Sequence, residues 1–358
     1  MQNKTQKYFI IAGEASGDIY GAQIAKEINS KTSAEIKGWG GDKMSAEGVN
    51  VSKHYRDLAF MGFVEVLLNL NTIRKNLNQC WEEIISFNPD ALILVDFPGF
   101  NMRIAKKAKL SGMKTYQVIC PQIWAWKASR IMQLKRDYNA VFPALPFEDQ
   151  ILKKGGVNSQ PLGHPIIDTF DDYKIEKKKG QIALLPGSRK QELKKMLPVF
   201  IDVAKNMKDF EFVIAGAPGL KVESYGNLDG IKLIFGKTRE LLAESEVAII
   251  TSGTATLEAA LLGTKQVIAY KTSSINFLIA KLLVKVKHIG LPNLILGREI
   301  IPELIQSDCS ANKIETSLIE ILNTNQQETE LKELRVKLGE SGASNRIANY
   351  IIKDSSSS

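Results

Sequence analysis

The feature that most constrains this sequence is a series of short apolar segments, each followed by a longer stretch with helical periodicity. Ala91–Val95 is typical, because it is apolar along its whole length instead of alternating with polar residues. Strands buried on both faces of a parallel sheet have this pattern, so the chain is predicted to be an α/β protein built from βαβ units. In the first half we expect strands at Tyr8–Ala12, Glu35–Gly38, Ala91–Val95, Thr115–Ile119 and Ala140–Pro143, and helices at Tyr20–Ile28, Phe63–Phe87, Met102–Leu110 and Ala128–Leu134.

The second half repeats this scheme, which in a chain of 358 residues predicts two domains. A charged stretch at 171–180 ends in glycine and is expected to be the linker between residues 1–170 and 181–338. Residues 339–358 are expected to form a terminal helix that packs back on the first domain. Strands are predicted at Gln181–Leu185, Glu211–Ala215, Lys232–Phe235, Val247–Thr251 and Gln266–Tyr270, with late helices at Glu330–Leu338 and Ala343–Ile352.

Composition excludes several classes of protein. Cys80, Cys120 and Cys309 are far apart and form no CxxC or Cys/His spacing, so we expect buried thiols and neither a disulfide framework nor a metal site. No apolar run is long enough to span a bilayer. The net charge of +8 suggests an anionic partner. The lysines are scattered without a nucleic-acid-binding module, so we expect no nucleic acid. The excess positive charge then indicates a phosphorylated substrate, an anionic membrane face or simply a lysine-rich surface that favours solubility.

The loop after the first predicted strand contains Gly13, Glu14, Ser16, Gly17 and Asp18. Its glycines permit a tight turn and close backbone approach to a ligand, and Ser16 or Asp18 is expected to cap the next helix. The loop lacks the GxGxxG fingerprint of dinucleotide-binding folds. It therefore predicts either a sugar site or a plain turn between a strand and a helix.

A loop in the second half contains Gly187, Ser188 and Arg189 between a strand and a helix. Ser188 and Gln191 form the pattern of a capping box. The N-terminus of a helix attracts anions, and arginine offers a planar charged fork for phosphate oxygens. This loop is predicted to bind phosphate.

A second turn of this kind contains Ser252, Gly253 and Thr254, with Glu258 one helical turn later. A carboxylate in that position can accept hydrogen bonds from ribose hydroxyls, or it can simply lie near the positive end of a helix. The two turns together favour a nucleotide diphosphate, which needs contacts to both phosphate and ribose.

Asp96 stands at the end of a predicted buried strand, followed by Asn101 in the next helix. Apolar neighbours are expected to raise the pKa of Asp96, which suits a general base that removes a hydroxyl proton. The alternative is a structural aspartate that caps the helix.

Other residues suggest less specific contacts. Trp124 and Trp126 either line a sugar or acyl site or pack in the interior, and His164 either faces donor phosphates or is a structural histidine. Each of two apolar segments with nearby lysine or arginine alone favours a core helix with solvated lysines, but the two together, in a basic chain, predict contact with an anionic membrane. Their candidate contact residues are Phe63, Val64, Val66, Leu67, Leu68 and Phe277.

Taken together, the motifs resemble the lipid-A-disaccharide synthase family. The matching segments run in the family's order along nearly the whole chain. They are AGEASGD (Ala12–Asp18), MGFVEVL (Met61–Leu67), Asp96 with Phe100 and Asn101, PQIWAW (Pro121–Trp126), LPFE (Leu145–Glu148), GHP (Gly163–Pro165), LLPGSR (Leu184–Arg189), SGTATLE (Ser252–Glu258) and LPNL (Leu291–Leu294).

The resemblance implies a GT-B fold, with two Rossmann-like doubly wound domains facing a central cleft. It implies an inverting transfer from UDP-2,3-diacylglucosamine to 2,3-diacylglucosamine 1-phosphate, giving a β-1,6-linked tetraacyl disaccharide 1-phosphate and UDP. It further implies a first domain for the acceptor and membrane, a second for the donor, no cofactor or metal, and a cytoplasmic enzyme peripheral to the inner face of the cytoplasmic membrane. A homodimer is left open.

Site residues follow from the same motifs. The resemblance implies Asp96 as the general base, Arg189 as the diphosphate clamp, Glu258 as the ribose contact and Asn293 as a lining residue of the UDP site. Glu14, Ser16 and Asp18 would lie on the acceptor side, and Glu14 or Asp18 could share the role of base. The family often has a second acid three residues after Asp96, where this chain has Gly99.

Three alternatives remain from the sequence. A hexosamine 2-epimerase or a lipid-linked transferase of cell-wall synthesis would share the architecture. The epimerase needs no lipid, so dependence on detergent or liposomes would distinguish it. A silent UDP-sugar sensor would bind UDP without turnover. A dehydrogenase is disfavoured because the dinucleotide fingerprint is missing.

Overall fold

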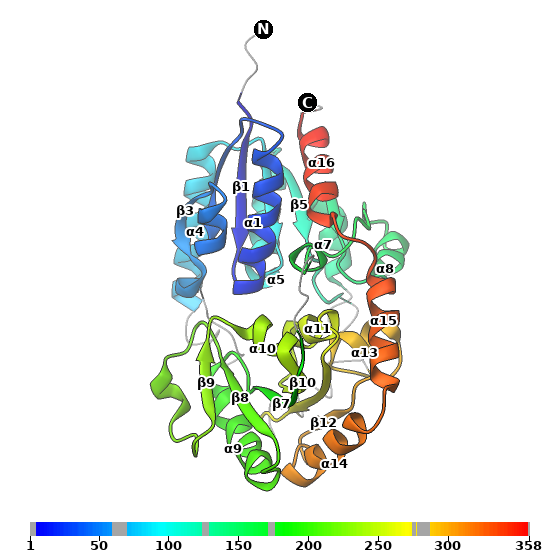
Figure 1. The fold of residues 1–358 in the computed structure, drawn as a ribbon. Coiled ribbons are helices and arrows are strands. Elements are labelled where there is room, and N and C mark those ends of the chain that lie inside the picture. Colours follow the sequence, from blue (N-terminus) through cyan, green and yellow to red (C-terminus); the bar gives the residue numbers. More distant parts are fainter. Residues whose placement is uncertain are drawn as a thin grey trace. The chain divides into compact units, whose positions relative to one another are not determined.

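The computed structural model describes residues 5–58, 70–123, 129–170, 176–273, 277 and 287–356. The chain divides into two compact units, of which the first comprises Met1–Thr169 with Glu340–Ser358 and the second Phe170–Gly339. The chain therefore enters the second unit once and returns to the first for its last helix (Figure 1).

The first unit contains a six-stranded parallel sheet in the order β3-β2-β1-β4-β5-β6. Its central strands are apolar, and all five residues of β4 are buried. Five strands lie where the sequence predicted them, whereas the edge strand β3 was missed because its sequence, NVSKH, is polar and partly exposed. The strands are β1 (Lys7–Ala12), β2 (Glu35–Gly40), β3 (Asn50–His54), β4 (Ala91–Val95), β5 (Lys114–Val118) and β6 (Ala140–Phe142).

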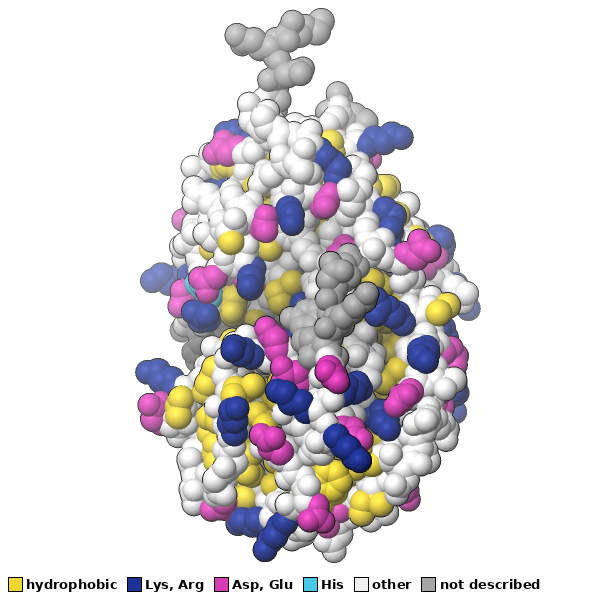
Figure 2. Space-filling view, in the orientation of Figure 1, with side chains coloured by type: hydrophobic (Ala, Val, Ile, Leu, Met, Phe, Trp, Pro, Cys, Tyr) yellow, Lys and Arg dark blue, Asp and Glu magenta, His cyan; other side chains and the backbone are white. Residues whose placement is uncertain are grey.

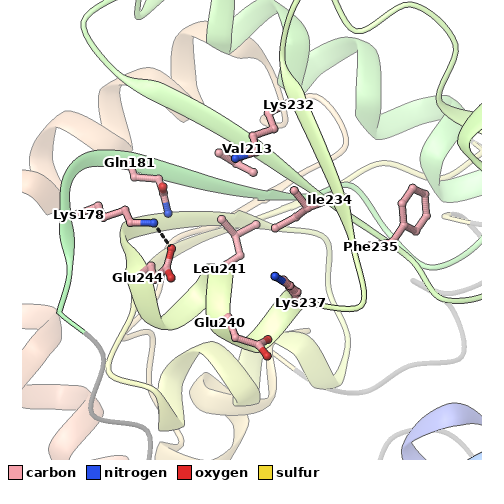
Figure 3. Close-up of a pocket in the computed structure, with 10 residues that line it drawn as sticks. All are labelled: Lys178, Gln181, Val213, Lys232, Ile234, Phe235, Lys237, Glu240, Leu241 and Glu244. Carbon is pink, nitrogen blue, oxygen red and sulfur yellow. Dashed lines mark hydrogen bonds and ion pairs between the residues drawn. The ribbon is translucent and has the colours of Figure 1, made fainter.

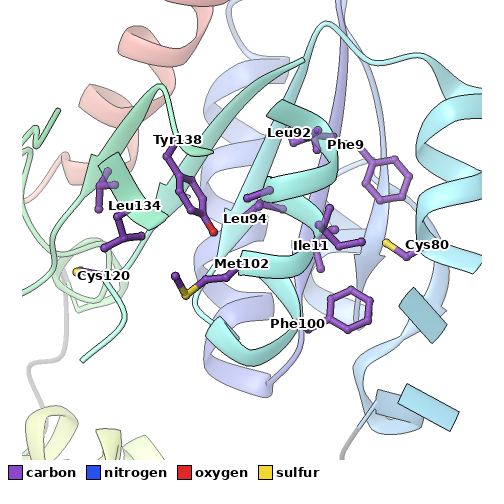
Figure 4. Close-up of a cluster of buried hydrophobic side chains, with 14 of the residues drawn as sticks. Phe9, Ile11, Cys80, Leu92, Leu94, Phe100, Met102, Cys120, Leu134 and Tyr138 are labelled. Carbon is purple, nitrogen blue, oxygen red and sulfur yellow. The ribbon is translucent and has the colours of Figure 1, made fainter. Parts of the chain in front are cut away.

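Helices cover this sheet, and one face buries a core that includes Phe9, Ile11, Leu94 and Phe100 (Figure 4). The described helices are α1 (Ala15–Asn29), α2 (Asp42–Ala46), α4 (Leu70–Phe87), α5 (Pro98–Leu110), α7 (Arg130–Asp137), α8 (Glu148–Lys154) and α16 (Ala343–Ser355). Cys80 and Cys120 are buried in this core as free thiols, as the sequence predicted, and Cys309 is a buried free thiol in the second unit.

The last helix, α16, is attached to the first unit by specific contacts. Both carboxylate oxygens of Asp168 accept hydrogen bonds from the N–H groups that begin α16, including those of Gly342 and Ser344, each at 2.6 Å. Ser344 also bonds Gln23 of α1 at 3.0 Å, and the ring of Tyr350 packs edge-on against Phe142 of β6. These contacts make α16 part of the first unit although the chain reaches it last.

The second unit has a six-stranded parallel sheet in the order β12-β11-β10-β7-β8-β9, which is the same topology as the first. Five strands were predicted, and the three-residue edge strand β12 was missed. The strands are β7 (Lys178–Leu185), β8 (Glu211–Gly216), β9 (Lys232–Phe235), β10 (Ser245–Ile250), β11 (Lys265–Tyr270) and β12 (Glu303–Ile305). The helices are α9 (Lys190–Asn206), α10 (Thr238–Glu244), α11 (Thr254–Leu261), α13 (Leu291–Leu296), α14 (Ala311–Leu322) and α15 (Gln326–Leu338).

In each sheet the strand order reverses at one point, between β1 and β4 in the first unit and between β7 and β10 in the second. Ligands of doubly wound sheets bind outside the carboxyl ends of the strands at this switch point. We therefore expect ligands to bind at the four loops that follow β1, β4, β7 and β10.

Candidate active site

The switch point of the first unit brings together two loops that the sequence had singled out. Ala12 at the end of β1 pairs with Val95 at the end of β4, so Gly13 and Asp96 leave the sheet side by side. Gly13 must be glycine, because a Cβ atom there would lie 2.3 Å from the ring of Phe97. Glu14 follows at the N-cap position of α1 and is partly buried.

Asp96 has the electrostatic character of a base that works near neutral pH. Its side chain is partly exposed, and burial raises its pKa from 3.8 to about 6, while a hydrogen bond from the backbone of Phe97 acts in the opposite direction. The prediction that apolar surroundings raise this pKa is confirmed.

The backbone around Asp96 is held in a rare conformation. Asp96 and Phe97 have φ angles of 47° and 49°, which non-glycine residues seldom adopt. Such conformations persist where surrounding contacts enforce them, and they cluster at functional sites.

Two buried amides supply these contacts. Nδ2 of Asn101 donates to the carbonyl of Asp96 at 2.8 Å and to that of Val95 at 3.3 Å. Nε2 of Gln117 donates to the Asp96 carbonyl at 3.3 Å and to the Ile119 carbonyl at 3.0 Å. Asn101 was expected to contact substrate, but it is fully buried and instead supports the turn that carries Asp96. Gln117 was missed, although a glutamine inside a buried strand is a visible clue.

The predicted helix cap at Ser16 or Asp18 is wrong. Ser16 is the second residue of α1, and Asp18 lies further inside this helix. Asp18 is buried, and its carboxylate accepts backbone N–H bonds from Gly41 at 2.7 Å, Met44 at 3.1 Å and Lys43 at 3.1 Å. Asp18 thus holds the start of α2, and the buried Gly17 beside it packs on Ala12 of β1. We assign both to the support of the loop.

The switch point of the second unit also unites two predicted loops. Leu185 of β7 pairs with Ile250 of β10, and the N–H of Thr251 donates to the Leu185 carbonyl at 2.9 Å. The loops that follow end at the exposed N-termini of α9 and α11. Two helix N-termini at one sheet edge place two positive dipole ends in the same region.

The first of these loops differs from its prediction in one respect. Arg189, not Ser188, occupies the N-cap position of α9, and the capping box with Gln191 is absent. Instead the carboxylate of Glu192 reaches back to the N–H of Ser188 at 3.0 Å and to the Arg189 guanidinium at 3.2 Å. Gly187 has a φ angle of 110°, and a Cβ atom there would lie 2.6 Å from that of Glu192, so only glycine fits this turn.

The second loop carries Ser252, Gly253 and Thr254 into α11. The Ser252 hydroxyl donates to the carbonyl of Ile289 at 3.2 Å, which ties the turn to the segment before α13. Glu258 lies one turn into α11, where Arg239 of α10 donates to its Oε1 atom from Nη2 at 2.8 Å. Arg239 was not identified from the sequence, because its pairing with Glu258 depends on the packing of two helices and no local sequence pattern predicts it.

Asn293 also has a different position from the one expected. Its side chain is fully buried, and Nδ2 donates to Glu303 at 2.7 Å and to the Ile301 carbonyl at 2.8 Å. Its Oδ1 accepts the N–H groups of Ile300 and Ile301. Asn293 therefore fixes the segment after α13 and is assigned to support of the loops at this edge.

His164 has the burial and contacts of a structural histidine, one of the two alternatives left by the sequence. It is buried, burial lowers its pKa to about 3, and its Nδ1 accepts the N–H of Ile166 at 3.1 Å. Its ring packs edge-on against Tyr20, with the centroids 5.6 Å apart.

Several predicted residues lie outside the described part of the chain. They are Phe63, Val64, Val66, Leu67 and Leu68 of the first apolar segment, Trp124 and Trp126, and most of the second apolar segment; Phe277 is described and partly buried. Within the described ranges, no helix is long and apolar enough to cross a bilayer. No cluster of His, Cys, Asp and Glu suited to a metal ion occurs among those residues.

A further cavity of about 500 Å³ lies beside α10, over β7, β8 and β9 (Figure 3). Its lining combines the apolar Val213, Ile234 and Leu241 with polar and charged residues, among which Lys178 forms an ion pair with Glu244. Figure 2 shows hydrophobic side chains with lysines or arginines among them over β8 and β9. Arg189 and Glu258 do not line this cavity, so it is separate from the two helix N-termini.

Two doubly wound parallel sheets of the same topology in one chain are the architecture of the GT-B class. Solved structures agree with this fold. UDP-GlcNAc 2-epimerase from Neisseria meningitidis bound to UDP-GlcNAc matches with a TM-score of 0.67 and 13% identity over 97% of this chain and 100% of that chain. The glycotransferase of kitacinnamycin matches with a TM-score of 0.62 and 13% identity over 98% and 99%. At such identities the likeness concerns the fold alone.

Sequence comparison assigns the family. The family model described as lipid-A-disaccharide synthetase matches residues 8–353. The lipid-A-disaccharide synthase of Syntrophus aciditrophicus is 33% identical, with 95% of each chain covered. That of Trichlorobacter lovleyi is 34% identical over 98% of this chain and 97% of its own. The chain belongs to the lipid-A-disaccharide synthase family, and it is a hexosyltransferase of lipid A biosynthesis.

Proposed function

We propose that the enzyme transfers a 2,3-diacylglucosaminyl group from UDP to the 6-hydroxyl of 2,3-diacylglucosamine 1-phosphate, with inversion at the anomeric carbon. The products are the β-1,6-linked tetraacyl disaccharide 1-phosphate and UDP. The observation that carries the proposal is the pair of helix N-termini at the β7/β10 switch point, with Arg189 on one and Glu258 on the other.

The donor is proposed to bind at this edge of the second unit. Its diphosphate would accept hydrogen bonds from the N-terminal N–H groups of α9 and α11 and from the guanidinium of Arg189, which is half-exposed and one turn from its partner Glu192. The Glu258 carboxylate would accept hydrogen bonds from the ribose hydroxyls. These donors would also stabilise the negative charge that develops on UDP as the glycosidic bond breaks.

The acceptor is proposed to bind at the β1/β4 switch point of the first unit, beside Gly13, Glu14 and Asp96. Asp96, ionised above pH about 6, would remove the proton of the acceptor hydroxyl as its oxygen attacks the anomeric carbon. The new carbon–oxygen bond forms as the bond to UDP breaks, and the proton ends on Asp96. The partly buried Glu14 is proposed to hydrogen-bond the acceptor sugar.

The acyl chains of both substrates require a lipid surface, so the enzyme is proposed to act as a peripheral protein on the inner face of the cytoplasmic membrane. Residues 63–68 and Phe277 are proposed to contact this surface. The net charge of +8 supports attraction to anionic lipid.

The test is release of UDP by purified protein supplied with both acylated sugars, with the product identified by mass spectrometry. A disaccharide of the expected mass, formed in the presence of a chelator and absent when UDP-GlcNAc replaces the acylated donor, supports the proposal. Turnover of UDP-GlcNAc without lipid, by epimerisation, would contradict it.

A further inference from the structure

The carboxylate of Glu258 is held by a guanidinium that the sequence did not reveal. Arg239, in the first turn of α10, donates to Oε1 of Glu258 from Nη2 at 2.8 Å and from Nε at 3.3 Å. Both side chains are 21% exposed, so the pair lies at the edge of the protein interior and is not a fully solvated surface contact.

An aromatic ring holds the same guanidinium. The Cζ atom of Arg239 lies 4.5 Å from the ring centroid of Phe170, a distance typical of a cation–π contact. Phe170 is buried and is the first residue of the second unit. Arg239 is therefore fixed by a carboxylate and by an aromatic ring.

This arrangement matters because a glutamate side chain is flexible. If a ligand must order a flexible glutamate when it binds, the lost side-chain entropy lowers its affinity. A glutamate that is already held in place avoids this loss. The hydrogen bonds from Nη2 and Nε of Arg239 to Glu258 both end on Oε1, so they hold that oxygen in place and restrict the orientation of the planar carboxylate. The N–H groups of a planar guanidinium point in fixed directions, whereas those of a lysine ammonium rotate freely.

We propose that Arg239 is a positioning residue that orients the Glu258 carboxylate toward the ribose hydroxyls of the donor, and that Phe170 in turn holds Arg239. The inference rests on the role proposed above for Glu258. Arg239 itself does not touch the nucleotide in this proposal, so its whole effect on the ligand passes through Glu258.

The experiment measures UDP binding to the full-length protein by titration calorimetry, together with 2′,3′-dideoxy-UDP, which lacks both ribose hydroxyls. The variants are Arg239→Ala, Arg239→Lys, Glu258→Gln and the double variant Arg239→Ala with Glu258→Gln. Arg298→Ala is the matched control, because Arg298 forms an ion pair with Glu333 at 2.6 Å elsewhere in the same unit. Melting temperatures verify that each variant is folded.

We expect Arg239→Ala to weaken UDP binding about threefold to tenfold, the cost of ordering one long side chain, with a smaller loss for Arg239→Lys. The loss should vanish in the Glu258→Gln background and for dideoxy-UDP, while Arg298→Ala binds UDP normally. Unchanged or tighter UDP binding by Arg239→Ala would overturn the inference, as would an equal loss in the Glu258→Gln background. If Glu258→Gln itself binds UDP normally, the proposed ribose contact fails, and the inference fails with it.

Discussion

Nδ2 of Asn101 lies 2.8 Å from the carbonyl oxygen of Asp96, and this bond anchors a turn in which two successive non-glycine residues have positive φ angles. Gln117 donates to the same carbonyl from the neighbouring strand. The candidate base is thus held by its backbone while its carboxylate remains partly exposed. Several measurable consequences depend on this arrangement.

Substitution of Asp96 is expected to abolish most catalysis. Asp96→Asn should reduce kcat at least ~100-fold, because the variant lacks a group able to take the acceptor proton. In the wild type, kcat/KM should fall as pH drops below about 6, since protonation removes the base. Initial rates of UDP release across the pH range check both points. A variant with near-normal turnover would exclude Asp96 as the base.

Asp96→Asn should increase the stability of the folded protein above pH about 6, although it abolishes most catalysis. The pKa of Asp96 is higher in the folded protein than its ordinary value of 3.8, so the folded state binds the proton more tightly than the unfolded state. Its contribution to stability is therefore present at low pH and is lost as pH rises from 3.8 through about 6. Above that range Asp96→Asn should be more stable than the wild type by about 1–3 kcal/mol. Thermal melts of both proteins at several pH values test this, and a gap that does not change with pH would contradict it.

Removal of a supporting amide should impair catalysis without affecting the donor site. Gln117→Leu is expected to lower kcat at least about tenfold, because the loss of its hydrogen bonds lets the Asp96 turn relax. UDP affinity should be unchanged. The control is Gln181→Leu, which removes another buried amide, one that donates to the Ser245 hydroxyl at 3.1 Å. If both variants lose activity in proportion to their loss of stability, Gln117 has only a structural role.

Arg189 is expected to act on the diphosphate. Arg189→Ala should lower turnover ~100-fold, the usual cost of losing one electrostatic contact to a leaving group, and should weaken UDP binding. Arg189→Lys should recover part of the activity, because it keeps the charge but loses the fork. Lys190→Ala, one residue further along, is the control for a general loss of positive charge. Equal effects at both positions would argue against a specific clamp.

Asp18 should matter for folding. Its buried carboxylate accepts three backbone N–H bonds at the start of α2, so Asp18→Ala leaves these donors without a partner. A loss of about 3–5 kcal/mol in the free energy of unfolding is expected. Denaturant unfolding checks the value. A variant as stable as the wild type that has lost activity would instead indicate a direct role with substrate.

The sequence predicted those parts of the fold that depend on local pattern. Ala91–Val95 is a strand with the bounds expected, because continuous apolar residues identify a buried parallel strand. Lys232–Phe235 also has the bounds expected, although it is a partly exposed edge strand that begins with lysine. Two other edge strands were missed, Asn50–His54 because it is polar and Glu303–Ile305 because it has only three residues. The four site loops were found because each directly follows a strand.

The roles of individual side chains at the site were harder to predict. Asn101, Asn293 and Asp18 are polar residues in motifs that match the family, and nothing local distinguishes a ligand contact from a buried support. The partners that make them supports lie on other segments, such as the α2 start for Asp18 and Glu303 for Asn293. Arg239 and Gln117 lie outside the matching motifs, so only tertiary packing brings them to the site.

The hydrogen bonds that attach α16 to Asp168 of the first unit also have a consequence for biosynthesis. Residues 170–339 leave the ribosome as an uninterrupted unit, whereas the first unit still lacks α16 until residues 340–358 have been synthesised. The second unit therefore matures before the first is complete, which inverts the usual order of folding along a nascent chain. A premature stop codon just before α16 would damage the unit of the enzyme whose synthesis began first.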